Sequence, residues 1–170
     1  MAYALAVFVH VTSAMGLFAS LAIEAASLLH ARRAGSAHRE VALAGYRWVG
    51  RVGPPSLAGV VLAGLYLAGT AWGWREPWID VALAGLAMIG VVGATMTFGR
   101  IGRLARAGDR GGFDDPVLWR SLTLRTALVL GVEFLMTVKP GWAGSLGAIA
   151  VAIGAGLIGG RPLIRRLAVP

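Results

Sequence analysis

Polar side chains recur on one face of an otherwise apolar segment at the start of the chain. The segment covers residues 2–30, and the residues concerned are His10, Ser13, Ser20, Glu24 and Ser27. At about 100° per residue, they fall within an arc of about 100° if the segment is a helix. A histidine can carry a proton near neutral pH or bind a metal or haem. This stripe is the first candidate for chemistry, and we expect it to face the interior of a helical bundle.

A second polar group lies in residues 117–139, where Thr126, Glu133 and Thr137 share one face by the same spacing. By helix rise, His10 lies about 10 Å and Glu133 about 9 Å from the same end of the bundle. The two side chains can therefore meet if their segments are neighbours. A carboxylate beside the imidazole would stabilise its charged form or fix its tautomer for a ligand role.

Glu24 lies nearer the opposite end of the first segment. Either Arg100 or Arg125 can pair with it there, because a carboxylate removed from water needs a positive partner. Three purposes remain open for these polar residues: structural contacts between helices, a haem or metal role, and the movement of protons or solutes.

The sequence lacks the motifs of several chemistries. It has no cysteine, which rules out disulfides, thiol catalysis and iron–sulfur ligation. No HxxxH, HxxH or ExxH pair occurs within a helix, and His30 and His38 are too far from His10 to share a haem with it, because the first segment is about 40 Å long. Nucleophile-elbow, Walker A and dinucleotide-binding motifs are also missing. We therefore predict no catalytic residues and no metal site built from side chains alone.

Five apolar segments must position these residues. The chain is 57% hydrophobic with a mean hydropathy of +0.72, above the range of soluble domains. The segments cover residues 2–30, 55–72, 77–99, 117–139 and 142–160, and each is long enough to cross a bilayer as a helix. The sequence therefore predicts an all-α integral membrane protein with a single domain over residues 1–170 and the lipid bilayer as its surroundings.

The connections carry signals of their own. Residues 36–52 are too polar to span a membrane, and they predict a short interfacial helix or a plain loop. Gly53-Pro54-Pro55 is expected to break the chain before the second span. Residues 108–112 predict a loop, Asp115-Pro116 predicts a helix start with Asp as N-cap, and Arg161-Pro162 is expected to end the last helix.

The distribution of charge predicts the orientation. Of the 16 Lys and Arg residues, all but Arg75 and Lys139 fall on one side of the five segments. The positive-inside rule then places the N-terminus outside the cytoplasm and the C-terminus inside, in a bacterial cytoplasmic (inner) membrane. Asp80 and Lys139 would lie at the outer rim, where four tryptophans also gather: Trp72, Trp74, Trp78 and Trp142. Because basic residues in these positions serve insertion, the net charge of +8 does not indicate a nucleic acid partner.

Small residues recur every fourth position in the last segment. The positions are Gly144, Ala148, Ala152, Gly156 and Gly160. In lipid, helices associate where small side chains let their backbones approach closely. This face can pack inside the bundle, or it can form a homo-oligomer or a larger membrane complex.

Four short motifs spread over most of the chain carry a family resemblance. They are His10 followed by Gly16-Leu17, Pro55 followed by Gly64-Leu65-Tyr66, Trp78-Ile79, and Met136-Thr137-Val138-Lys139-Pro140-Gly141. Together they resemble the bacterial membrane family called domain of unknown function 2269. More distantly, the chain is similar to the bacterial membrane-bound protoporphyrinogen oxidases and the copper-resistance D proteins.

The distant resemblance implies that His10 is an axial ligand of haem b. Two departures stand against the oxidase activity. Where those oxidases have a lysine early in the third helix, this chain reads Asp80-Val81-Ala82, and their Asn-Glu-x-Pro has no counterpart near Arg125-Thr126-Ala127. Haem binding can survive these losses, whereas we do not expect the oxidase reaction.

The sequence supports three hypotheses of function. We expect a non-enzymatic accessory or transport-type membrane protein, since no catalytic constellation is present. One alternative is a haem b or redox protein using His10. The other is a proton-coupled transporter that works through His10, Glu133 and Glu24.

Overall fold

The computed structural model describes residues 1–31, 36–106 and 115–165, and within these ranges the chain is helical and contains no strand. The elements are α1 (Ala2–Ala31), α2 (Ser36–Leu67), η1 (Ala68–Trp72), α3 (Pro77–Val92), η2 (Gly93–Phe98), α4 (Gly99–Arg106), α5 (Pro116–Val138) and α6 (Trp142–Arg165). Both η elements are π-helical turns that continue a neighbouring α-helix. The predicted loop at 108–112 and the side chain of His38 lie outside this description.

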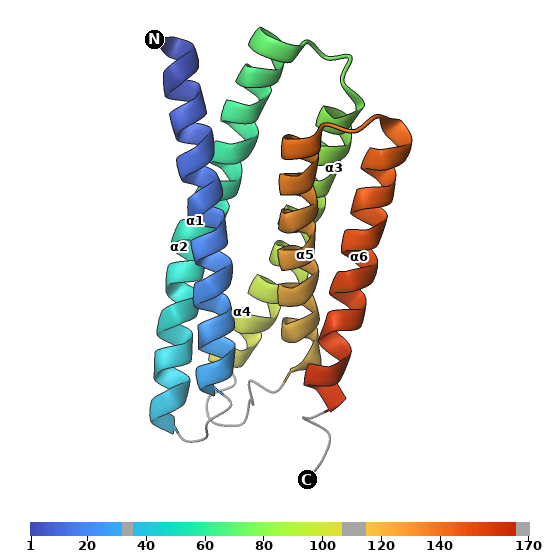
Figure 1. The fold of residues 1–170 in the computed structure, drawn as a ribbon. Coiled ribbons are helices and arrows are strands. Elements are labelled where there is room, and N and C mark those ends of the chain that lie inside the picture. Colours follow the sequence, from blue (N-terminus) through green and yellow to red (C-terminus); the bar gives the residue numbers. More distant parts are fainter. Residues whose placement is uncertain (32–35, 107–114, 166–170) are drawn as a thin grey trace.

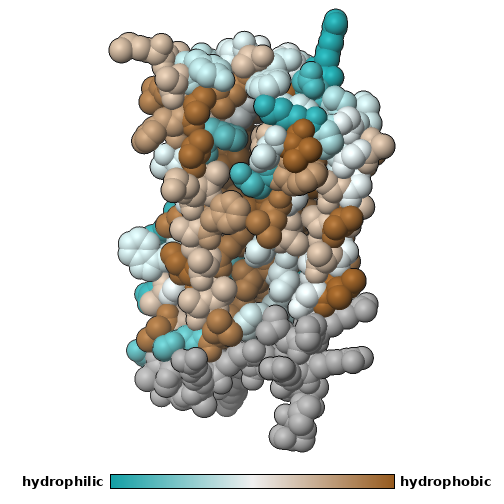
Figure 2. Space-filling model, in the orientation of Figure 1, coloured by the Kyte–Doolittle hydropathy of each residue, from teal (hydrophilic) through white to brown (hydrophobic). Residues whose placement is uncertain are grey.

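Five helical runs are long and apolar enough to cross a membrane, which confirms the prediction of an all-α chain with five such helices. They are Ala2–Ala31, Glu40–Trp72, Pro77–Arg103, Pro116–Val138 and Trp142–Gly159. Large apolar side chains stay exposed along the flanks of the bundle, such as Leu62 at 68% and Val151 at 72%. Figure 2 shows apolar residues over much of this flank between the two ends of the molecule. Such a surface suits contact with lipid tails rather than water.

The helices form two groups that lie side by side (Figure 1). In the first, α1 packs along α2 in antiparallel orientation, and in the second, α5 packs on α6 and on α3. Contacts within each group are much more extensive than contacts between them. The N-terminus, η1 and the turn between α5 and α6 lie at one end of the bundle, called here the N-terminal end. We call the boundary between α1/α2 and α3/α5 the seam.

The predicted break at Gly53-Pro54-Pro55 is wrong, because α2 passes through both prolines without interruption. The separate interfacial helix or loop over residues 36–52 is therefore also wrong, since this segment is the first half of α2. Its apolar residues Ala42, Tyr46 and Val49 are buried in the bundle. Each proline removes one backbone hydrogen bond, and packing along a neighbouring helix can offset that loss.

Glycines and small polar residues join α1 to α2. A Cβ atom at Gly45 would overlap Ser27 Oγ, and one at Gly53 would lie 2.8 Å from Ser20 Oγ. The same relation pairs Gly59 with Ser13, Gly64 with His10, and Gly16 of α1 with Ser56 of α2. Four members of the predicted polar stripe therefore lie against glycines of α2, which confirms that the stripe faces the bundle.

The stripe of small residues in α6 packs on α5. A Cβ at Gly156 would lie 2.7 Å from the Cα of Leu124, and Ala152 Cβ is 2.9 Å from where a Cβ at Gly131 would stand. Thr123 Oγ1 also donates a hydrogen bond to the Gly156 carbonyl at 2.9 Å. Ala148 is half-buried, Gly144 is exposed, and the packing of Gly160 lies outside the described part. The central part of this face is thus occupied within the chain, and an oligomer stays a prediction.

Two helix ends test the predicted signals. Asp115 caps α5, because its Oδ1 accepts a hydrogen bond from the Val117 amide at 2.9 Å and Pro116 follows at the first position, as predicted. The predicted end of the last helix at Arg161-Pro162 is wrong, since α6 continues to Arg165. One proline removes a single backbone hydrogen bond, and the helix runs only a few residues beyond it.

Candidate functional site

A buried ion pair crosses the seam in the half of the bundle away from the N-terminal end. Arg125 Nη2, from α5, lies 2.6 Å from both Oε1 and Oε2 of Glu24, from α1. Glu24 is completely buried, and Arg125 is 6% exposed. The pairing of Glu24 with Arg125 is one of the two that the sequence predicted, and it is confirmed. The other, Arg100, instead forms an ion pair with Asp115 at 2.6 Å.

Two hydroxyl groups complete the environment of this pair. Arg125 Nη2 donates to Thr97 Oγ1 at 2.9 Å, and Arg125 Nε donates to Ser121 Oγ at 3.2 Å. Thr97 Oγ1 and Ser121 Oγ lie 2.8 Å apart, and both side chains are fully buried. A buried charge loses its hydration and needs hydrogen-bond partners in its place. These hydrogen bonds supply many of them for the two charges. The cluster is thus defined as Glu24, Thr97, Ser121 and Arg125.

Sequence reasoning did not single out Thr97 or Ser121. Ser121 precedes Arg125 by one helical turn, so it shares its face of α5, and this spacing could have identified it. Thr97 had no such signal, because it lies in the π-helical segment η2, where side chains do not follow the α-helical period. The local change of period in η2 is invisible in the sequence and sets which residue of this run faces the cluster.

His10 lies on the same seam nearer the N-terminal end. Its Nδ1 is 3.0 Å from the carbonyl oxygen of Val60 in α2, and its ring packs on Gly64. A carbonyl can only accept a hydrogen bond, so the neutral imidazole carries its proton on Nδ1. Nε2 is then the acceptor, which is the state that binds a metal or receives a proton.

His10 and Glu133 come near each other without pairing. Both line a small cavity of about 30 Å³, together with Met136. Among the described residues, however, no ion pair within 4 Å joins them, and Glu133 is exposed. Thr137 is exposed too, and its hydroxyl donates to the Glu133 carbonyl of its own helix at 2.9 Å. The structure therefore places the two groups at one cavity but does not make them a contact pair.

The N-terminal end of the seam carries a cation held by aromatic rings. Lys139 Nζ lies 3.8 Å from the centre of the Trp72 ring and 5.9 Å from that of Trp78. The two indoles meet edge to face with centroids 5.6 Å apart. Asp80 is exposed in the first turn of α3, where a negative charge complements the helix dipole. Lys139 and Asp80 thus lie at the same end of the bundle.

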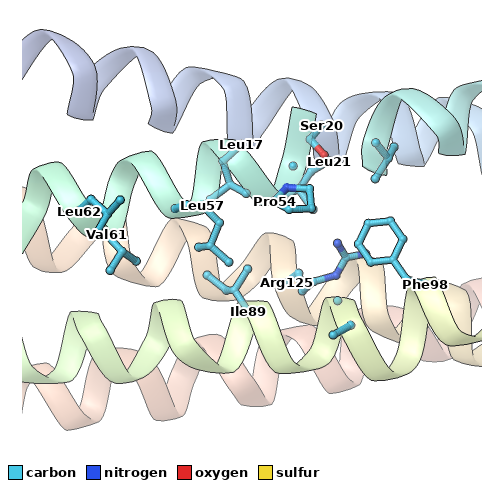
Figure 3. A pocket seen from close by; sticks show the side chains of 16 residues that line it. Leu17, Ser20, Leu21, Pro54, Leu57, Val61, Leu62, Ile89, Phe98 and Arg125 are labelled. Carbon is cyan, nitrogen blue, oxygen red and sulfur yellow. The ribbon is translucent and has the colours of Figure 1, made fainter. Parts of the chain in front are cut away.

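Three cavities follow one another along the seam. The first, of about 360 Å³, reaches from Lys139 and Trp72 to His10. The small cavity beside Glu133 comes next, because His10 also lines it. The third, of about 500 Å³, shares Leu17 with the second and is bordered by Arg125 (Figure 3). The ion pair and the histidine therefore lie on one chain of cavities.

The cavity at His10 has several features of a haem site. It offers a histidine whose Nε2 is left as an acceptor, apolar walls that include Leu83 and Leu86, and Lys139 as a partner for a carboxylate. Met136, a second residue type that ligates haem iron, lines it as well. A metal site of side chains alone has less support, because the described residues contain no cluster of three His, Asp or Glu.

Comparison with protein-family models, with curated proteins and with solved structures finds no match in any of the three. The resemblance to the family of domain of unknown function 2269, and the more distant ones, thus stay predictions.

Proposed function

We propose that this protein is a non-enzymatic, multi-pass membrane protein of the transport type, which admits a small solute into the seam between its two helix groups. The proposed orientation has the N-terminus outside the cytoplasm and the C-terminus inside, in a bacterial inner membrane. The observation that carries the proposal is the chain of cavities along the seam, with the buried Glu24–Arg125 pair bordering its largest member.

Movement of one helix group relative to the other is easier than movement of helices within a group. Small residues bring α1 close to α2 and α5 close to α6 at several positions, and larger side chains with cavities between them line the seam. Rigid groups separated by a loosely packed boundary can shift as units, as hinge and shear motions require. Because the ion pair joins α1 to α5, it would bias the balance between closed and open arrangements.

Cysteine labelling tests the entry to the seam, since the chain has no native cysteine. Leu83→Cys lines the cavity at His10, and Val11→Cys, on the exposed face of α1, is the matched control. In right-side-out vesicles, a membrane-impermeant maleimide should label Leu83→Cys at least several times faster than Val11→Cys. Equal rates at the two positions would overturn the proposal.

The same method tests the orientation. Arg75→Cys lies at the N-terminal end of the bundle and Glu40→Cys near the other end, and both positions are exposed. The impermeant reagent should label Arg75→Cys in intact cells and Glu40→Cys only after lysis. The reverse pattern would refute the proposed topology.

A second candidate function is haem b binding, which the hydrogen bond from His10 Nδ1 to the Val60 carbonyl favours. His10 would supply an axial ligand, Lys139 could pair with a haem carboxylate, and the bound haem would supply one-electron redox chemistry. The absorption spectrum of protein purified from haem-replete cells decides this. A Soret band that disappears in His10→Ala establishes the role, and a colourless preparation refutes it.

The geometry gives less support to proton-coupled transport through His10, Glu133 and Glu24. His10 and Glu24 are about 21 Å apart along α1 by helix rise, and Glu24 is engaged by Arg125. Proton flux into proteoliposomes that is unchanged in Glu133→Gln would exclude Glu133 from such a path.

A further inference from the structure

The largest cavity of the seam is apolar, opens to the surface beside Leu62, and has one cationic side chain in its wall. It measures about 500 Å³, within the range of small-molecule sites. Figure 3 shows leucine side chains of α1 and α2, Ile89 of α3 and Phe98 of η2 around it, with the Arg125 side chain pointing between them. Among the described residues that line it, Arg125 is the sole charged one.

Arg125 does not use all its donors on the cluster. Nε and Nη2 make its hydrogen bonds to Glu24, Thr97 and Ser121, and Nη1 has no partner among the described residues. Nη1 lies on the side of Gly93, since a Cβ there would be 3.7 Å from it, and Gly93 also lines the cavity. Arg125 as a whole is only 6% exposed, so an acceptor beside Nη1 on the cavity side would stabilise the guanidinium.

A hydroxyl in the same wall adds a second donor. Ser20 of α1 is 3% exposed and lines the cavity, and its Oγ makes no hydrogen bond within the described part of the chain. Two donors without acceptors, on residues that are otherwise buried, therefore border one apolar space. This combination calls for a ligand with an acceptor oxygen on an apolar body.

The charge of the cluster decides what kind of acceptor fits. Glu24 already neutralises Arg125, with both carboxylate oxygens 2.6 Å from Nη2. A second carboxylate beside Nη1 would bring an uncompensated negative charge into a region that excludes water, which is costly. A neutral carbonyl accepts the same hydrogen bond without adding charge.

We propose that this cavity binds a neutral, lipid-soluble molecule whose carbonyl oxygen accepts a hydrogen bond from Arg125 Nη1, with its apolar body against α2 and α3. This inference rests on the seam as the place that admits the solute, and it names the class of that solute. The narrow small cavity separates this chamber from the His10 cavity, so the two sites are distinct.

Three matched probes test the head group: 2-heptadecanone, palmitate and heptadecane. Native mass spectrometry of the full chain in detergent measures the fraction bound. The ketone should bind about tenfold or more tightly than the hydrocarbon, as one hydrogen bond to a charged group implies, and more tightly than palmitate. Equal binding of ketone and hydrocarbon, or tighter binding of palmitate, would overturn the proposal.

Variants locate the site. Ala58→Trp should fill the cavity and lower ketone binding about tenfold, whereas Ala19→Trp, on an exposed face of α1 outside the cavity, should leave it unchanged. Arg125→Lys keeps a positive charge for Glu24 but removes the Nη1 donor, so ketone binding should fall to that of the hydrocarbon. Equal ketone binding in Ala58→Trp and Ala19→Trp refutes the site even if Arg125→Lys fails to fold.

Glu24→Gln changes the net charge of the cluster from zero to +1. Without the carboxylate, Arg125 carries a free charge, and palmitate should gain affinity relative to the ketone. Unchanged selectivity would contradict the charge argument.

The site and the transport-type function fail separately. Exchange of the ketone between proteoliposomes and acceptor vesicles measures movement, and Ala58→Trp should slow it relative to Ala19→Trp. If the ketone binds but exchanges no faster than from protein-free vesicles, the binding site stands and the transport-type function is overturned.

Discussion

The tight interfaces within each helix group and the seam between the groups are built from different residues. Within the groups, glycine meets serine or alanine so closely that added Cβ atoms would collide, as at Gly53 and Gly131. Across the seam, charged and bulky side chains meet, and cavities separate them. Small residues therefore hold the helices together within each group, and a buried ion pair joins the two groups across the seam.

The difference shows that a polar residue in an apolar helix can either pack in a tight interface or join two helix groups by an ion pair. Ser13 and Ser27 belong to a tight interface, where their small size matters and a backbone carbonyl can satisfy the hydroxyl, as Ile23 does for Ser27 at 2.7 Å. Glu24, on the same face, reaches across the seam to a partner on α5. A polar stripe on one helix thus combines packing residues with one residue that joins the groups.

Breaking the ion pair should have the largest effect on the seam. Arg125→Met leaves Glu24 buried without its partner, and the free energy of unfolding should fall by roughly 3–5 kcal/mol. Unfolding by dodecyl sulfate, followed by circular dichroism, measures this. The double variant Glu24→Leu/Arg125→Met removes both charges and should recover most of the loss. An equally large loss in single and double variants would show that the cluster matters through packing rather than charge.

Breaking a tight interface should cost less. Gly156→Ala brings a methyl group against the backbone of Leu124, so α5 and α6 must move apart, at a cost of roughly 1–3 kcal/mol in unfolding free energy. Gly154→Ala, where nothing lies within 4 Å, is the matched control and should be neutral or slightly stabilising because alanine favours helix. Equal behaviour of the two variants in the same unfolding assay would contradict the close approach.

Removing the seam histidine should have a smaller effect on stability. His10→Ala loses one hydrogen bond to the Val60 carbonyl, worth about 0.5–1.5 kcal/mol. Val11→Ala, on the exposed neighbouring position, controls for the loss of side-chain volume. If His10→Ala costs no more than Val11→Ala in the unfolding assay, the bond does not hold α1 to α2, and any need for His10 would be functional.

The smallest effect is expected at the rim of the seam. Lys139→Gln removes the cation beside Trp72, which should cost about 0.5–1 kcal/mol and change the tryptophan fluorescence. Arg51→Gln is the control, because Arg51 lies farther from the Trp48 ring, at 5.7 Å, and its loss should change less. A larger change in Arg51→Gln would mean that the Lys139 contact is not formed in solution.

Much of the fold could be predicted because a long apolar helix can be recognised from a short window of sequence. Runs of apolar residues predicted the five helices that are long enough to cross a membrane, and Asp115 before Pro116 predicted a helix start. The prediction of a break at Pro54 and Pro55 was wrong, although local propensity favours one there. Residues of α2 before and after the prolines pack on α1, and this packing keeps α2 continuous.

The site was only partly predictable for a related reason. Glu24 stands out because a carboxylate in an apolar segment is rare, and few arginines could meet it. The choice of Arg125 over Arg100, and the addition of Thr97, depend on which helices become neighbours and on the π-helical turn of η2. Neither follows from local sequence.

The sequence by itself determined the five apolar segments, the polar stripe and the small-residue stripe, because residue types at fixed helical spacing decide which face can be buried. Only the tertiary structure decided that α6 uses its small residues on α5, that Glu24 pairs with Arg125, and that cavities remain along the seam. The physical reason is that burial and pairing depend on the neighbour a face meets. That neighbour is chosen by packing between segments far apart in the chain.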